Sequence, residues 1–127
     1  MDPVSDMFIR IKNAGKAGHE TVQIPYSKLK HDIAKTLERF GFVGKVDKKG
    51  KRIKKFLEFP LVYQEESPLV RNVKLISKPS RRIYSSYRVF HRVRHRGIVI
   101  VSTPRGVMSS DEAKKMRVGG EMIAEIW

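Results

Sequence analysis

Apolar residues recur at helical spacing in two stretches of the first forty residues. The first stripe consists of Val4, Met7, Phe8 and Ile11. It follows Asp2-Pro3, an N-cap with proline at the first helical position, and Gly15 ends it. The second stripe consists of Leu29, Ile33, Leu37 and Phe40. Ser27 can cap this second helix, and Gly41 can end it because glycine accepts left-handed backbone geometry. The pattern predicts two amphipathic helices.

Shorter apolar runs around these helices predict strands. We expect strands over residues 20–25, 42–46, 53–59 and 70–76. A turn at 47–50, which reads Asp-Lys-Lys-Gly, joins the second and third of them. The first part of the chain is therefore predicted as α-β-α-β-β-β, with two helices on one face of a small sheet.

The remaining third follows Ser77-Lys78-Pro79-Ser80, which combines proline with small polar residues and is interpreted as a linker. Beyond it we expect strands over 82–84, 97–101 and 121–127, and a helix over 111–116 that Ser109 or Ser110 caps. The predicted fold is α+β (α/β) with two small packed domains, residues 1–76 and 77–127. The second domain should be mostly antiparallel β with one short helix.

Charge narrows the range of functions. The chain of 127 residues carries 27 Lys and Arg against 13 Asp and Glu, a formal charge of +14. Such an imbalance suits a phosphate-rich partner, although a merely soluble cationic protein would share it. The chain has no cysteine, an acidic N-terminus and no apolar run of membrane-spanning length. We therefore expect a soluble intracellular protein without a membrane partner, located in the cytoplasm or, as the alternative, in an organelle.

The two parts differ in the kind of cation they carry. Residues 1–80 hold thirteen lysines among seventeen basic residues, whereas 81–127 hold eight arginines among ten. Lysine is a hydrated point charge, while the planar guanidinium of arginine can bind phosphate through two bonds or stack on a base. Geometric recognition is therefore expected in the second part. Lys28 and Lys30, at the start of the second helix, could reach phosphate or form a solvated helix face.

Aromatic and cationic residues alternate over residues 82–96. In an extended chain Arg92, Arg94 and Arg96 would share one face, as in proteins that hold unpaired RNA bases. Within this stretch we expect Phe90 in the core and Tyr84 at the surface. His91 and His95 have the spacing of a helical metal pair, but no cysteine or nearby carboxylate completes a site, so no metal and no cofactor are expected.

The stretch Ser102-Thr103-Pro104-Arg105-Gly106-Val107-Met108-Ser109 follows the apolar run 98–101 and is predicted to be a loop. Hydroxyl groups both donate and accept hydrogen bonds, arginine contacts phosphate, and glycine permits close approach of the backbone. This combination indicates recognition of a nucleic acid. An enzyme is the rival class, but neither serine lies in a Gly-x-Ser-x-Gly elbow and no histidine is near in sequence.

An ordered series of motifs resembles the small-subunit ribosomal protein S8 family over nearly the whole chain. The matching segments are Asp2-Pro3-Val4-Ser5-Asp6-Met7, Arg10-Ile11-Lys12-Asn13-Ala14, Pro25-Tyr26-Ser27-Lys28-Leu29-Lys30, Gly41-Phe42-Val43, Lys78-Pro79 with Arg82-Ile83-Tyr84, Ser102-Thr103-Pro104-Arg105-Gly106-Val107-Met108 and Gly119-Gly120-Glu121. The resemblance implies a structural, non-enzymatic constituent of the small ribosomal subunit with two α/β domains. A free-standing RNA-binding regulator outside the ribosome remains the alternative.

The same resemblance implies partners and site residues. The partners are the central domain of small-subunit ribosomal RNA, neighbouring ribosomal proteins and, in bacterial members, messenger RNA of the protein's own operon. Ser102, Thr103, Arg105 and Gly106 would lie against a distorted RNA groove. Glu121 would support them or accept bonds from RNA, and Arg82 and Tyr84 would flank the same surface.

Two residues depart from the family pattern. Pro104 stands where serine is common and removes a backbone donor, and Arg105 stands where lysine is common. We expect Ser102 to contribute to specificity and Lys30 to contribute mainly salt-sensitive affinity.

Overall fold

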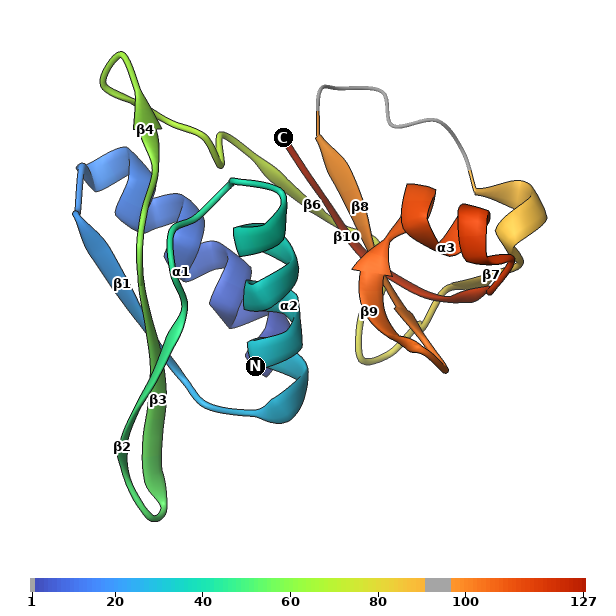
Figure 1. The fold of residues 1–127 in the computed structure, drawn as a ribbon, viewed down its shortest axis with the longest axis horizontal. Coiled ribbons are helices and arrows are strands. Elements are labelled where there is room, and N and C mark those ends of the chain that lie inside the picture. Colours follow the sequence, from blue (N-terminus) through green and yellow to red (C-terminus); the bar gives the residue numbers. More distant parts are fainter. Residues whose placement is uncertain (1, 91–96) are drawn as a thin grey trace. The chain divides into compact units, whose positions relative to one another are not determined.

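The computed structural model describes residues 2–90 and 97–127. The chain folds into two compact units, Pro3–Arg71 and Asn72–Trp127 (Figure 1). Within the described residues, three α-helices and a larger number of antiparallel strands confirm the predicted α+β class. The domain boundary between residues 76 and 77 stays a prediction.

The first unit combines two helices with a three-stranded antiparallel sheet. The helices are α1 (Pro3–Ala17) and α2 (Lys28–Arg39), and the sheet has the order β1 (Thr21–Pro25), β3 (Lys54–Pro60), β2 (Asp47–Lys51) (Figure 1). A short ribbon of β4 (Tyr63–Gln64) and β5 (Ser67–Pro68) follows.

The core of the first unit is formed by one face of the sheet and the inner faces of the helices. Val22, Ile24, Leu57 and Phe59 alternate with more exposed neighbours along their strands, as expected of a half-buried sheet. Buried side chains of the helices include Met7, Phe8, Ile11, Ile33 and Leu37. The two predicted apolar stripes are thus largely confirmed.

The second helix begins as predicted but buries a different face at its ends. The Ser27 side chain accepts a hydrogen bond from the Lys30 amide at 3.1 Å, which confirms the cap. Leu29 and Phe40 of the predicted stripe are 38% and 41% exposed, whereas Lys30 is buried. These two side chains lie at the first and last turns, where helical spacing no longer decides which neighbours a side chain meets.

The hairpin of the first unit differs from the prediction. Residues 42–46, expected as a strand, form only an isolated bridge between Val43 and Leu61. Residues 47–50, expected as a turn, belong to β2, and the turn lies at Arg52-Ile53. The polar composition of β2 disfavours a strand, but pairing with β3 overrides this preference because β propensity depends strongly on context.

Within its described residues, the second unit combines a five-stranded antiparallel sheet with one α-helix and one 3₁₀ turn. The strands of the main path run in the order β6 (Val73–Leu75), β10 (Gly120–Ile126), β8 (Ile98–Thr103), β9 (Gly106–Ser109), and β7 (Tyr84–Ser85) also pairs with β10. The helices are the 3₁₀ turn η1 (Tyr87–Val89) and α3 (Ser110–Met116) (Figure 1). The strand predicted over 70–76 therefore joins the C-terminal sheet and not the N-terminal one, because its partner is β10.

A small apolar core lies between this sheet and α3. It consists of Phe90, Val99, Val101, Met108 and Ala113. Phe90 is 7% exposed, which confirms its predicted place in the core. Ser109 caps α3 through a capping box, since its side chain accepts from the Glu112 amide while its own amide donates to the Glu112 carboxylate.

Glu38 ties the end of α2 to the segment before β2. Its Oε1 atom accepts a hydrogen bond from the Val46 amide at 2.7 Å, with the Lys35 ammonium at 3.5 Å. The backbone hydrogen bond, aided by Lys35, lowers the pKa of this carboxyl below its ordinary value. The stability that the charge contributes is present above the unfolded pKa and is lost as pH falls through the folded one.

We predict that Glu38→Gln makes thermal stability less sensitive to pH between about 5 and 3, since the glutamine amide does not titrate in this range. At pH 7 the variant should melt below the native protein because a neutral acceptor replaces a charged one. Melting temperature measured across this pH range by circular dichroism provides the check. An unchanged pH profile would contradict the assignment.

Candidate nucleic-acid interface

The predicted loop at 102–109 is a tight β-hairpin. Ser102 and Thr103 end β8, Gly106 begins β9, and only Pro104 and Arg105 form the connection. The expectation of a loop was wrong over most of its length because strand pairing continues to Thr103 and Gly106. A two-residue connection fixes the register of both strands and so fixes where each side chain points.

Side-chain and backbone geometry hold this turn. The Thr103 hydroxyl accepts from the Arg105 amide at 3.1 Å and donates to the Gly106 carbonyl at 2.8 Å. Its proton is therefore used inside the turn, and only its acceptor capacity remains for a partner. Gly106 has a φ of +119°, which side-chain-bearing residues rarely adopt, so here glycine is required by backbone conformation.

Four side chains line up across the sheet at the level of the hairpin. Tyr84 on β7 pairs with Glu121 on β10, Glu121 pairs with Ser102 on β8, and Ser102 pairs with Val107 on β9. Directly paired residues share one face of a sheet. We call Tyr84, Glu121, Ser102 and Val107 the cross-strand row. Their neighbours Val101, Met108 and Met122 belong to the opposite face, which carries the apolar core.

The row carries polar groups of several kinds. An Arg82 nitrogen lies 3.3 Å from a Glu121 oxygen, and the two side chains are 46% and 19% exposed. Tyr84 is 71% exposed, and Arg105 is exposed at the turn. Among the residues that the structure describes, the Ser102 hydroxyl has no hydrogen-bond partner. The structure thus brings together seven of the nine predicted site residues: Ser102, Thr103, Arg105, Gly106, Glu121, Arg82 and Tyr84.

Two glycines allow the strands to approach closely enough to form this row. A Cβ atom at Gly120 would overlap the Ser102 carbonyl oxygen and crowd Thr103, and one at Gly119 would crowd the Ser85 carbonyl. The Gly-Gly-Glu motif therefore has a steric meaning that the sequence alone did not reveal. It seats β10 against both neighbouring strands and sets Glu121 in the row.

Ser77 is a structural residue of the site that the sequence analysis misassigned to a linker. It is buried, its hydroxyl donates to the Met122 carbonyl at 2.6 Å, and the same oxygen accepts from the Ile83 amide at 2.9 Å. Residues 78–81 form a turn closed by hydrogen bonds between Lys78 and Arg81. The linker prediction was wrong because Ser-Lys-Pro-Ser serves here as a turn that holds Arg82 and Tyr84 beside β10.

The two predicted lysines belong to the first unit and not to this cluster. Lys28 is exposed, and its ammonium nitrogen lies 3.4 Å from a carboxylate oxygen of Asp32, one helical turn away. Lys30 is 6% exposed, and burial lowers the pKa of its ammonium group. A buried lysine is poorly placed for phosphate, so the expected electrostatic role of Lys30 is not favoured by the structure.

Residues His91 and His95, and the arginines Arg92, Arg94 and Arg96, lie outside the described residues. Within the rest of the chain no group of three His, Cys, Asp or Glu side chains is arranged to hold a metal ion. The same described part contains no helix that is long and apolar enough to cross a membrane.

Comparison with known proteins places the chain among ribosomal proteins. Three curated relatives from Dictyoglomus turgidum, Synechococcus elongatus and Prochlorococcus marinus strain SARG bear the name small ribosomal subunit protein uS8. They are 40%, 37% and 40% identical to this chain, and each alignment covers 99% of the chain and 97% of the relative. The family model described as Ribosomal protein S8 matches residues 2–127. The chain therefore belongs to the ribosomal protein S8 family.

Membership of the ribosomal protein S8 family establishes the general function of the protein. The protein is a structural constituent of the small ribosomal subunit that binds ribosomal RNA and takes part in translation. The resemblance of the sequence motifs to this family is thus confirmed over nearly the whole chain.

The close approach of β10 and β8 predicts that Gly120→Ala is more damaging than Gly106→Ala. An added methyl at Gly120 meets backbone, whereas nothing lies within 4 Å of one at Gly106, which suffers only from its positive φ. We expect Gly120→Ala to lower the free energy of unfolding by about 3 kcal/mol or more, since the added methyl meets backbone. Gly106→Ala should lower it by about 1–2 kcal/mol, the cost of a positive φ for a residue that carries a Cβ. Urea denaturation of the two variants and the native protein provides the measurement, and equal losses would contradict the steric argument.

Proposed function

We propose that the cross-strand row and the β8–β9 turn bind an internally looped helix in the central domain of small-subunit ribosomal RNA, and that this binding helps to assemble the platform of the subunit. The observation that carries the proposal is the free hydroxyl of Ser102 within the described structure, set between an arginine-held carboxylate and a cationic turn. Such an array offers donors, acceptors and charge on one rigid surface.

The chemistry of the row suits base edges and riboses more than phosphates. The Ser102 hydroxyl can donate to one RNA group and accept from another, including a 2′-OH. Glu121 repels phosphate but can accept from base amino groups, and Arg82 holds one of its oxygens at 3.3 Å. Sequence-specific RNA recognition requires bases whose edges are reachable, and an irregular internal loop provides them.

The flanking residues supply affinity and stacking. Tyr84 presents most of its ring to solvent, next to Glu121 in the register, and an exposed ring can stack on an unpaired base. Arg105 lies in the turn between β8 and β9, where its guanidinium can reach phosphate. Pro104 has no amide proton, so the turn presents a side chain in place of a backbone donor. The proposed role is binding and not catalysis.

The experiment compares binding of the full-length protein to the looped central-domain helix and to a fully paired duplex of equal length. We predict that Ser102→Ala reduces the preference for the looped RNA about fivefold, the equivalent of one hydrogen bond of about 1 kcal/mol. Arg105→Gln should weaken binding to both RNAs and make it less steeply dependent on salt.

Ser80→Ala is the matched control, since Ser80 is an exposed serine in the turn that precedes Arg82. It should leave the preference unchanged. If Ser102→Ala and Ser80→Ala behave alike, the row is not the site of recognition. Messenger RNA of the protein's own operon, where it has a similar looped shape, would bind the same residues and compete with the ribosomal RNA helix. Co-sedimentation with small subunits separates the ribosomal role from that of a free regulator.

A further inference from the structure

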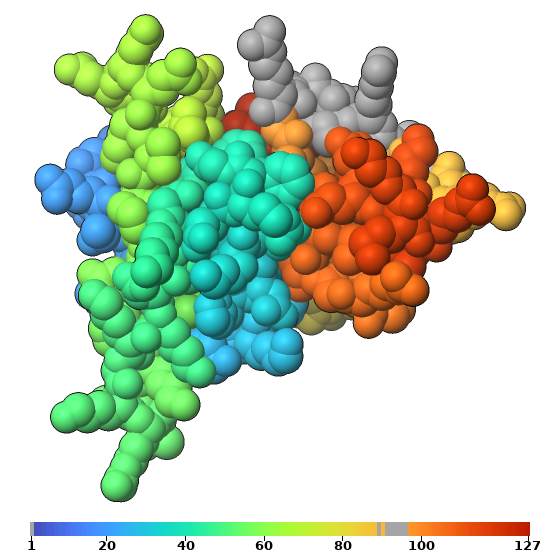
Figure 2. All heavy atoms as spheres, viewed as in Figure 1, coloured from blue at the N-terminus to red at the C-terminus, as the bar shows by residue number. Residues whose placement is uncertain are grey.

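The β2–β3 hairpin extends beyond the sheet to which it belongs. β1 pairs with β3 only as far as the pair Pro25–Phe56, whereas β2 and β3 remain paired down to Lys51–Lys54. Lys49 lies opposite Phe56, the last residue of β3 that pairs with β1, and residues 50–55 beyond it have no third strand. All seven residues from 49 to 55 are exposed. We call these seven residues the arm. In Figures 1 and 2 the arm projects from the rest of the first unit at the lower left.

Five of the seven arm residues are cations: Lys49, Lys51, Arg52, Lys54 and Lys55. Lys49 is paired with Glu58 at 2.7 Å. The other four have no ion pair among the described residues. Lys51 and Lys54 oppose each other directly across the hairpin, an arrangement that destabilises a sheet in isolation. A partner that carries negative charge would convert this repulsion into attraction.

Protection of a sheet edge accounts for only part of the arm. Lysines on an edge strand discourage pairing with other chains. Both strands of the arm are edges, because β1 has ended, so this protection applies to Lys49 and Lys51 on β2 and to Lys54 and Lys55 on β3. It does not account for Ile53, which is 97% exposed at the tip between Arg52 and Lys54.

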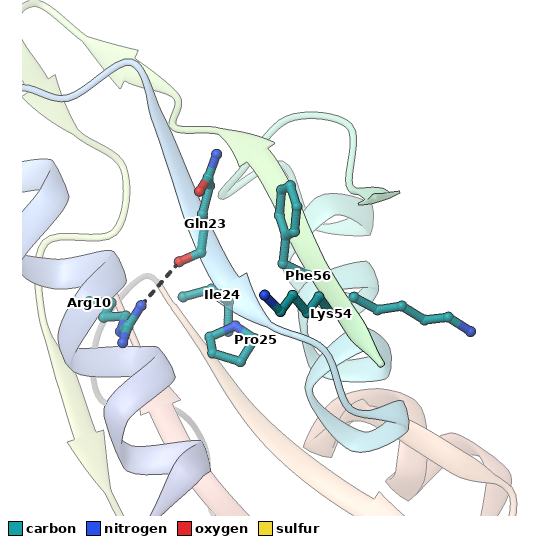
Figure 3. Close-up of a pocket in the computed structure, with 7 residues that line it drawn as sticks. Arg10, Gln23, Ile24, Pro25, Lys54 and Phe56 are labelled. Carbon is teal, nitrogen blue, oxygen red and sulfur yellow. Dashed lines mark hydrogen bonds between the residues drawn. The ribbon is translucent and has the colours of Figure 1, made fainter. Parts of the chain in front are cut away.

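The foot of the arm is hollowed and also cationic. A cavity of about 300 Å³ lies there, with walls of Arg10, Gln23, Ile24, Pro25, Lys54, Lys55 and Phe56 (Figure 3). The Arg10 Nε atom lies 3.0 Å from a carboxylate oxygen of Asp6. The same guanidinium donates a hydrogen bond to the Gln23 carbonyl at 3.5 Å (Figure 3). A concave region that contains an aromatic ring thus adjoins the arm, and Lys54 and Lys55 belong to both.

We propose that the arm is a second RNA contact of this protein, which grips the sugar–phosphate backbone of helical RNA without reading its sequence. The cations of the arm lie against phosphates, and Ile53 packs on ribose in the shallow minor groove. A paired RNA helix presents its riboses in a wide, shallow minor groove, whereas its major groove is too narrow for side chains. The basic residues of the arm match the phosphates at the edges of this groove, and the exposed apolar side chain of Ile53 matches the riboses between them.

This second RNA-binding surface is separate from the cross-strand row and would remain if the row were not the site of specificity. The two proposals are therefore tested by different readouts. The row is tested by the ratio of affinities for looped and paired RNA. The arm is tested by a loss of affinity that is the same for both RNAs, together with a smaller dependence on salt.

The test variant is Lys51→Gln with Lys54→Gln, in the full-length protein. Because the two ammonium groups oppose each other, their removal should leave the melting temperature unchanged or raise it, so any loss of binding is not due to unfolding. We predict that affinity for the looped helix and the paired duplex falls about tenfold on each. The slope of log affinity against log salt should decrease by about two, one for each phosphate that the variant no longer neutralises.

The matched control is Lys16→Gln with Arg71→Gln, which removes two exposed positive charges from elsewhere in the first unit. It should reduce the slope by clearly less than the arm variant. Equal effects of the two variants would overturn the proposal, because they would mean that only net charge matters. Ile53→Ser should weaken binding to both RNAs about threefold without a change in slope, and unchanged affinity would overturn the role of Ile53.

A membrane surface is the other polyanion that a basic hairpin with an apolar tip could meet. Sedimentation with vesicles that contain about 30% phosphatidylserine, in the presence of the paired RNA, distinguishes the two. If the native protein stays bound to the RNA, the proposal is supported. If the native protein moves from the RNA to the vesicles, and the variant with both Lys51→Gln and Lys54→Gln does not, the proposal is overturned.

Discussion

Strand β10 of the second unit has to pair along both of its edges. On one side it meets β8 over most of its length, and on the other it meets β7 and then β6. The neighbouring strands can pair with the start of β10 only if the residues there lack side chains. A Cβ atom at Gly119, just before β10, would overlap the Ser85 carbonyl, and a Cβ atom at Gly120 would overlap the Ser102 carbonyl. Directly after these glycines Glu121 pairs with Tyr84 and Ser102, before the register of β10 against β8 shifts between Met122 and Ala124. A shift by one residue at Glu121 would turn its side chain to the apolar face of the sheet.

The two surfaces that we propose to face RNA differ in charge, and the difference separates their tasks. In the cross-strand row the charge of the Glu121 carboxylate is offset by the Arg82 guanidinium at 3.3 Å. The row also presents the Ser102 hydroxyl, and hydrogen bonds to base edges are what carry sequence selectivity. The arm contains four cations without an ion pair among the described residues, and its attraction to phosphate is the same for any sequence. In these two proposals, affinity and specificity are carried by separate side chains.

Elements with a strong hydrophobic period could be predicted from the sequence, and elements fixed by pairing could not. Both long helices follow from local patterns, and so does the Ser27 cap of α2. Gly15, expected to end the first helix, lies inside it, because α1 continues to Ala17. The strand β2 has the composition of a turn, and only its pairing with β3 makes it a strand. Ser77 reads as part of a linker, yet its hydroxyl bonds two backbone groups that lie 6 and 45 residues away. Nothing in the local sequence encodes those partners.

The site divides in the same way. Its residues could be found from motif and charge, because hydroxyl, arginine and glycine side chains cluster after a buried strand. Their division of labour could not, since it depends on which hydroxyl is already bonded: Thr103 closes the turn, and Ser102 is left for a partner in the described structure. For Ile53 the hydrophobic pattern gives a wrong prediction. Hydrophobic pattern assigns it to a strand and hence to a buried sheet, but the sheet has ended before the chain reaches it. An apolar residue that no part of its own unit covers, set among cations, is explained by a partner surface that is anionic at its rims and apolar between them.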